Sequence, residues 1–111
     1  MTSVTFLNCN GEIKGFHIKG HATKNADDVL GKQVCSAVSS ACYLVCNTVT
    51  EVLKLKCDIT VKDGEMKFLL AKSNKEAVDL LKGFKIHILG LKEQYNNLIT
   101  TETEDILNVK D

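Results

Sequence analysis

The stretch GFHIKGHATKNADDVLGKQVCSAVSSACYLVCNTV, residues 15–49, joins a strand pattern to a helix pattern. It begins with alternating apolar and polar side chains, and its second half repeats apolar residues at the period of an amphipathic helix. A polar loop lies between them. This order places His21 at the end of a strand and Cys35 near the start of a helix, and the rest of the chain determines which fold carries this unit.

Two dipeptides predict two hairpins. Asn10-Gly11 and Asp63-Gly64 both favour the positive φ angles of a type I′ turn, and strand-like residues flank both of them. In the second hairpin, apolar residues alternate with polar ones, which predicts one buried and one solvent-exposed face. We therefore expect four strands, at about residues 2–9, 12–20, 56–62 and 65–71.

Two longer segments have helical periodicity. The first covers residues 33–54. The second begins near Ser73, where the sequence Ser-Asn-Lys-Glu has the form of a capping box that ends at Glu76. The polar tail, residues 100–111, could add an edge strand or fray. The apolar stripes consist of Val34, Val38, Ala41, Val45, Val49, Val52 and Leu53 in the first helix, and of Ala77, Leu81, Phe84, Ile88, Leu91, Tyr95 and Leu98 in the second.

The element order ββαββα predicts an α+β fold in one domain, residues 1–111. Two hairpins form a mostly antiparallel sheet, and the two helices cover its apolar face. A sheet this small leaves open edges, which a homodimer could cover.

Composition narrows the class of protein. The 14 acidic and 14 basic residues balance, which argues against a dedicated nucleic-acid binder. We find no N-terminal apolar signal and no run of about twenty apolar residues, so we expect a cytoplasmic protein with no membrane partner. Five cysteines without a secretion signal predict reduced thiols rather than a disulfide framework.

A cysteine and a histidine could together perform acyl transfer. Cys35 is expected in the first turn of its helix, where unpaired N–H groups and the helix dipole favour a thiolate. His21 could take the thiol proton and return it to the leaving amine. Ser39, one turn after Cys35, could bond to the thiol or to substrate. The alternative is an ordinary loop in which the two residues occur together by chance.

A metal site is a weaker hypothesis. Cys42 and Cys46 lie four residues apart, and a site with His21 would take several ligands from one helix. Zinc sites rarely use such spacing, and the chain has no CxxC pair. We expect these cysteines to be small packing residues, and we expect no metal and no cofactor.

The motif Gly20-His21-Ala22, a polar loop, and then Val34-Cys35 with Ser39 on a helix resemble the Prp family of ribosomal-processing cysteine proteases. The length and element order extend the resemblance over nearly the whole chain. It implies a small cytoplasmic bacterial dimer that removes an N-terminal extension from a large-subunit ribosomal protein. By the same resemblance Cys35 is the nucleophile, His21 is the general base and acid, and Gly20, Ala22 and Ser39 support them.

One position departs from the family pattern G-x-D-I-V-C, since Lys32 stands where the family has an aspartate. An aspartate there would cap the helix and could orient the histidine. Asp27 or Asp28, in the longer loop, could supply that carboxylate, and Gly31 could serve as the N-cap. The departure motivates an alternative function, a non-catalytic ribosome-assembly binding protein that holds the ribosomal protein's N-terminus without cutting it.

The resemblance also implies a peptide substrate. We expect the peptide to add as a strand to a free edge of the first hairpin. We expect the loop from Thr23 to Lys32 to close over it.

Overall fold

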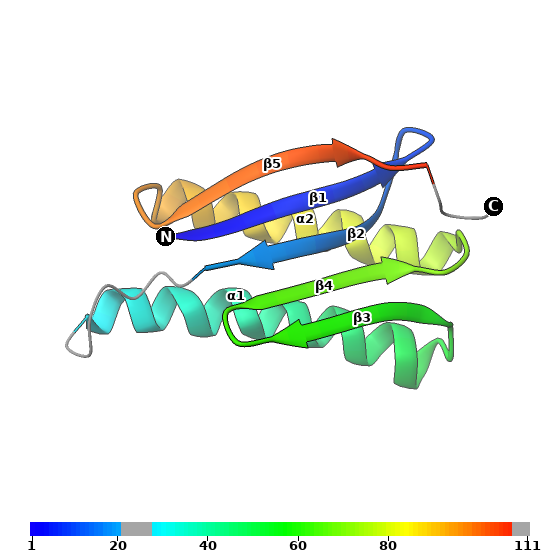
Figure 1. Cartoon of the computed structure of the whole chain (residues 1–111), viewed down its shortest axis with the longest axis horizontal. Coiled ribbons are helices and arrows are strands. Elements are labelled where there is room, and N and C mark those ends of the chain that lie inside the picture. Colours follow the sequence, from blue (N-terminus) through cyan, green and yellow to red (C-terminus); the bar gives the residue numbers. More distant parts are fainter. Residues whose placement is uncertain (21–27, 108–111) are drawn as a thin grey trace.

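The computed structural model describes residues 1–20 and 28–107. A five-stranded sheet of order β3-β4-β2-β1-β5 carries two helices on a single face (Figure 1). Adjacent strands are antiparallel except for β5, which runs parallel to β1. The elements are β1 (Thr2–Cys9), β2 (Glu12–Lys19), α1 (Val29–Asn47), β3 (Cys57–Lys62), β4 (Glu65–Leu70), α2 (Lys75–Gln94) and β5 (Ile99–Asp105).

This architecture confirms the α+β fold and the mostly antiparallel sheet. The polar tail forms the edge strand β5, the first of the two outcomes expected for it. At the first turn, Asn10 (φ 54°) and Gly11 (φ 79°) both have positive φ, as a type I′ turn requires. At the second turn only Gly64 (φ 72°) does, so the type I′ prediction is wrong there.

The second hairpin buries less than its alternation predicted. In β4, Met66, Phe68 and Leu70 are buried, but in β3 Ile59 is 39% exposed and Val61 is 57% exposed. The predicted buried face of β3 is therefore wrong for the single chain. The reason is that β3 is the outermost strand of the sheet and pairs with β4 alone.

Helix α1 begins earlier than predicted. Asp28 is its N-cap, and the Asp28 Oδ1 atom accepts a hydrogen bond from the Gly31 N–H at 2.9 Å. The predicted start at residue 33 and the predicted Gly31 cap are therefore wrong, because Asp28 satisfies an N–H of the first turn. A π-helical turn, Thr48–Val52, extends the helix, and the chain leaves it at Lys54, which has a φ angle of 56°.

Helix α2 is capped one residue later than predicted. The Asn74 Oδ1 atom accepts from the Ala77 N–H at 3.0 Å, so the capping box at Ser73 is wrong. The Ser73 hydroxyl instead accepts a hydrogen bond from Lys14 Nζ, whose side chain is almost fully buried. A buried ammonium group needs such partners, and this one takes the predicted capping hydroxyl.

The core forms between the helices and the sheet. Both predicted stripes pack there, except that Val52 is 72% exposed. By length and composition alone, Val29–Val52 would suffice to cross a membrane, since an 18-residue window within it has a mean hydropathy of 1.3. In this fold Val34, Val38 and Val45 of that segment belong to the core, and 33% of the window is buried.

Candidate active site

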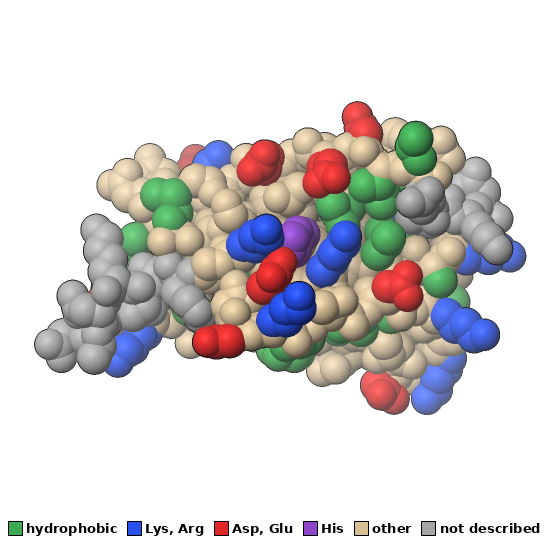
Figure 2. All heavy atoms as spheres, viewed as in Figure 1, with side chains coloured by type: hydrophobic (Ala, Val, Ile, Leu, Met, Phe, Trp, Pro, Cys, Tyr) green, Lys and Arg blue, Asp and Glu red, His purple; other side chains and the backbone are tan. Residues whose placement is uncertain are grey.

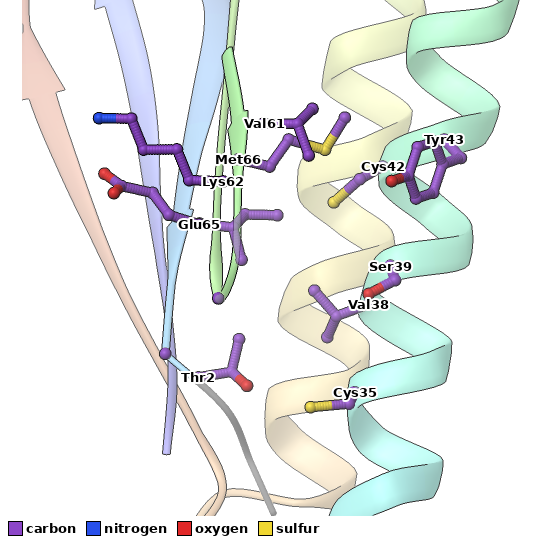
Figure 3. Close-up of a pocket in the computed structure, with 13 residues that line it drawn as sticks. Thr2, Cys35, Val38, Ser39, Cys42, Tyr43, Val61, Lys62, Glu65 and Met66 are labelled. Carbon is purple, nitrogen blue, oxygen red and sulfur yellow. The ribbon is translucent and has the colours of Figure 1, made fainter. Parts of the chain in front are cut away.

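A pocket of about 150 Å³ lies between α1 and the end of the sheet at which β2 stops (Figure 3). One wall is a face of α1, and the other combines β1, β2 and the turn between β3 and β4. The lining residues are Cys35, Val38, Ser39, Cys42 and Tyr43 on the helix, and Thr2, Ile18, Gly20, Val61, Lys62, Gly64, Glu65 and Met66 on the sheet.

Cys35 is half-buried, and its thiol points from α1 toward the sheet (Figure 3). The prediction that it lies in the first turn of the helix is wrong. Because α1 begins at Val29, Cys35 is in the second turn. The influence of a helix N-terminus falls off within the first turn, so Cys35 lies beyond the part of α1 where that influence is strong.

Ser39 lies one turn after Cys35 and lines the same pocket, as the sequence predicts. Tyr43 follows one turn later and is half exposed. The three residues share a helix face because they are four residues apart. The same four-residue spacing is the sequence signal that indicates Tyr43 as a further residue of this helix face.

Gly20, the residue directly before His21, lines this pocket. Its N–H donates to the Gly64 carbonyl oxygen at 2.8 Å, which ties the end of β2 to the β3–β4 turn. Its φ is +86°, and an added Cβ would lie 2.6 Å from the Met1 carbonyl oxygen. Both facts require glycine at this position. The predicted site residues His21, Ala22 and Asp27 lie outside the described residues.

The other cysteines are packing residues. Burial, with a contribution from Cys46, raises the pKa of the Cys42 thiol to about 12, and burial raises the pKa of Cys46 to about 11. Burial and the adjacent Asp58 raise the pKa of Cys57, which is half-buried in β3. All five cysteines are described and none forms a disulfide. Within residues 1–20 and 28–107, no cluster of His, Cys, Asp and Glu side chains could hold a metal ion.

The sheet face that points away from the helices has charged side chains and a histidine near its middle, with apolar side chains beside them (Figure 2). His17 Nε2 lies 2.6 Å from Glu65 Oε2, and this hydrogen bond is the main cause of the lowered pKa of Glu65. The Glu65 carboxylate points away from α1 (Figure 3). His17 alternates with the buried residues Phe16 and Ile18, so it faces away from Cys35.

Some pocket residues carried no signal in the sequence. Thr2 opens β1, and the segment from Val61 to Met66 comprises the end of β3, the turn and the start of β4, so only tertiary pairing brings these residues to the pocket of Cys35. The same pairing excludes the expected strand addition to the first hairpin. β1 is paired with β5 and β2 with β4, so neither strand of that hairpin has a free edge.

Comparison with known proteins identifies the class of this protein as the cysteine proteases. The sequence model of the family described as cysteine protease Prp matches residues 1–100. The chain therefore belongs to the Prp family. No curated protein matches its sequence.

Solved structures share the fold. The ribosomal processing protease Prp from S. aureus, in complex with a covalently linked product peptide, is 21% identical with a TM-score of 0.82, over 94% of this chain and 100% of that one. The same protease with a substrate peptide is 18% identical, with the same TM-score and coverage. SMU.848 from Streptococcus mutans is 20% identical with a TM-score of 0.78, over 96% of each chain.

Replacing Gly20 by alanine should destabilise the fold. Left-handed backbone in a residue other than glycine costs about 1–3 kcal/mol, and the added Cβ would also press on the Met1 carbonyl. Urea denaturation measures the loss. The matched control is Gly83→Ala in α2, where no atom lies within 4 Å of the added Cβ and where the helix should gain about 0.5–1 kcal/mol. Equal midpoints for Gly20→Ala and the wild type would contradict this account of Gly20.

Proposed function

We propose that this protein is a cysteine endopeptidase that removes the N-terminal extension of a large-subunit ribosomal protein. Cys35 is the nucleophile and His21 the general base and acid. One observation carries the proposal: in a member of a cysteine protease family, Cys35 lines a pocket together with Gly20, the residue directly before His21. The S. aureus relative, named as a ribosomal processing protease, supports the choice of substrate.

The proposed reaction has two halves. His21 takes the proton of the Cys35 thiol as sulfur attacks the scissile carbonyl carbon, and a tetrahedral oxyanion forms. The C–N bond then breaks, the leaving amine takes the proton from His21, and an acyl-thioester remains on Cys35. In the second half His21 removes a proton from water, which attacks the thioester. The C–S bond breaks, and the new carboxyl end leaves as the thiol is restored.

Other residues have supporting roles in this proposal. Ser39 is placed to hydrogen-bond to the thiol or to substrate from one turn along α1. Asp28 has a capping role through its bond to the Gly31 N–H, so Asp27 becomes the better candidate for a carboxylate that orients His21. The reaction requires no metal and no cofactor, and we place it in the cytoplasm, where bacterial ribosomes mature.

Cleavage of the proposed substrate tests the function directly. The substrate is a peptide that spans the N-terminal extension of the host ribosomal protein, analysed by mass spectrometry. The wild type should make a single cut, and Cys35→Ala and His21→Ala should each lower kcat/KM by about 10⁴-fold or more, because the two residues act as a unit. Cys57→Ala, a second half-buried cysteine in the edge strand, should cut normally. A His21→Ala variant with full activity would rule out the dyad.

The alternative is the non-catalytic binding protein on the same fold. Two observations favour it: Cys35 lies outside the first turn of α1, and Lys32 replaces the family's aspartate. The binder would retain the same peptide without cutting it.

Thiol alkylation separates the two functions without a substrate. Cys42 and Cys46 should resist iodoacetamide at pH 8, because their pKa values of about 12 and 11 keep them protonated. The informative control is His21→Ala, because burial and Asp58 raise the pKa of Cys57 and lower its reactivity independently of any dyad. A dyad should make Cys35 of the wild type react at least about tenfold faster than Cys35 of His21→Ala. Equal rates in the two proteins would favour the binding protein.

We also propose a homodimer, which the exposed edge supports. Ile59 and Val61 leave apolar surface on β3, whose outer edge pairs with no described strand, and such edges are normally covered. Sedimentation should give twice the mass of one chain for the wild type and a monomer for Ile59→Lys. Thr60→Lys, on the other face of β3, should stay dimeric. A dimeric Ile59→Lys would exclude β3 as the interface, and a monomeric wild type would exclude the dimer.

A further inference from the structure

The hydroxyl group of Thr2 is buried in the candidate site without a partner. Thr2 is only 2% exposed, and its Oγ1 atom has no hydrogen-bond partner among the described residues. The residue lines the same pocket as Cys35 and Ser39. Its hydroxyl faces α1, and the Cys35 thiol points back toward the sheet (Figure 3).

The requirements of folding do not account for this hydroxyl. The Thr2 backbone N–H is already bonded to the Leu98 carbonyl oxygen, so the strand pairing is complete without the side chain. Valine has nearly the same shape and an equal preference for strands. A buried hydroxyl without a partner is destabilising, whereas valine would avoid that cost. A hydroxyl here becomes favourable when something polar enters the pocket.

The size and lining of the pocket indicate which polar ligand would bind to this hydroxyl. A cavity of about 150 Å³ between apolar side chains is large enough for a benzene ring. Ile18, Val38 and Met66 supply apolar walls, and Thr2 adds a group that can both donate and accept a hydrogen bond. A peptide offers the matching combination, because it carries an apolar side chain beside main-chain N–H and C=O groups.

We propose that Thr2 is a substrate-positioning residue: its hydroxyl hydrogen-bonds to a main-chain amide of the substrate residue whose apolar side chain fills this pocket. The inference rests on the proposed function and goes beyond it, since it assigns a subsite and names the residue that orients the peptide there. Thr2 takes no part in the bond-breaking steps.

Thr2→Val tests the proposal because it should keep or raise the stability of the protein and at the same time weaken substrate binding. Its thermal midpoint should equal or exceed that of the wild type. Its KM for the ribosomal-protein peptide should rise by about three- to tenfold, the value of one neutral hydrogen bond, with kcat little changed. Thr2→Ser, which keeps the hydroxyl, should restore the wild-type KM.

Calorimetry of peptide binding to the Cys35→Ala protein tests the role of Thr2 without requiring catalysis. Thr2→Val in that background should weaken peptide binding by the same factor. The matched control is Asn8→Ala, since Asn8 Oδ1 is also buried without a partner among the described residues but lies near the far end of β1. It should leave peptide affinity unchanged.

Three outcomes would overturn the assignment. If Thr2→Val binds and cleaves the peptide like the wild type, the hydroxyl meets a water molecule only, and the proposed function stands without this role. If Thr2→Val lowers the thermal midpoint while peptide affinity is unchanged, the hydroxyl serves folding. If the wild type neither binds nor cleaves the peptide, the proposed function and the role of Thr2 fail together.

Discussion

The stacking of phenylalanine side chains is the interaction on which the rest of the structure depends. Phe16 of β2 lies 5.3 Å from Phe68 of β4 and 4.6 Å from Phe84 of α2, measured between ring centroids. Phe6 of β1 meets Phe84 edge-on at 6.3 Å. These are the four phenylalanines of the chain, and they join three strands to one helix. The stack therefore holds β2, the strand that ends at Lys19 directly before Gly20, between its neighbours and α2.

Helix α1 has no phenylalanine and is held differently. Small side chains, among them Val34, Val38 and Cys42, form its buried stripe against the same face of the sheet. Large rings fill the space beside α2, whereas small residues leave room beside α1 at the end of the sheet. The pocket occupies that room, with Cys35 on one side and Gly20 on the other. The site is therefore a consequence of unequal packing by the two helices.

The parts of the fold that depend on local chemistry could be predicted from the sequence. The Asn10-Gly11 turn and both helical stripes are examples, because each depends on residues close in the chain. Helix starts were harder, since neighbouring residues compete to cap. Lys14, 59 positions away, holds the hydroxyl of Ser73 and leaves the cap to Asn74. The residues of the sheet that line the pocket could not be predicted either, because they are also distant in the chain. Thr2 comes to the same pocket as Cys35 only when the sheet has assembled.

The start of α1 bears on how the proposed nucleophile is activated. The family pattern places an aspartate three residues before the cysteine, where this chain has Lys32. The capping carboxylate in this chain is that of Asp28, seven residues, or about two helical turns, before Cys35. That distance separates the thiol from the N-terminal end of α1, whose field falls off within the first turn. In the proposed mechanism the imidazole of His21 must therefore supply most of the activation. The two hydroxyls that line the pocket, on Ser39 and Thr2, would then be left to bind and orient the peptide.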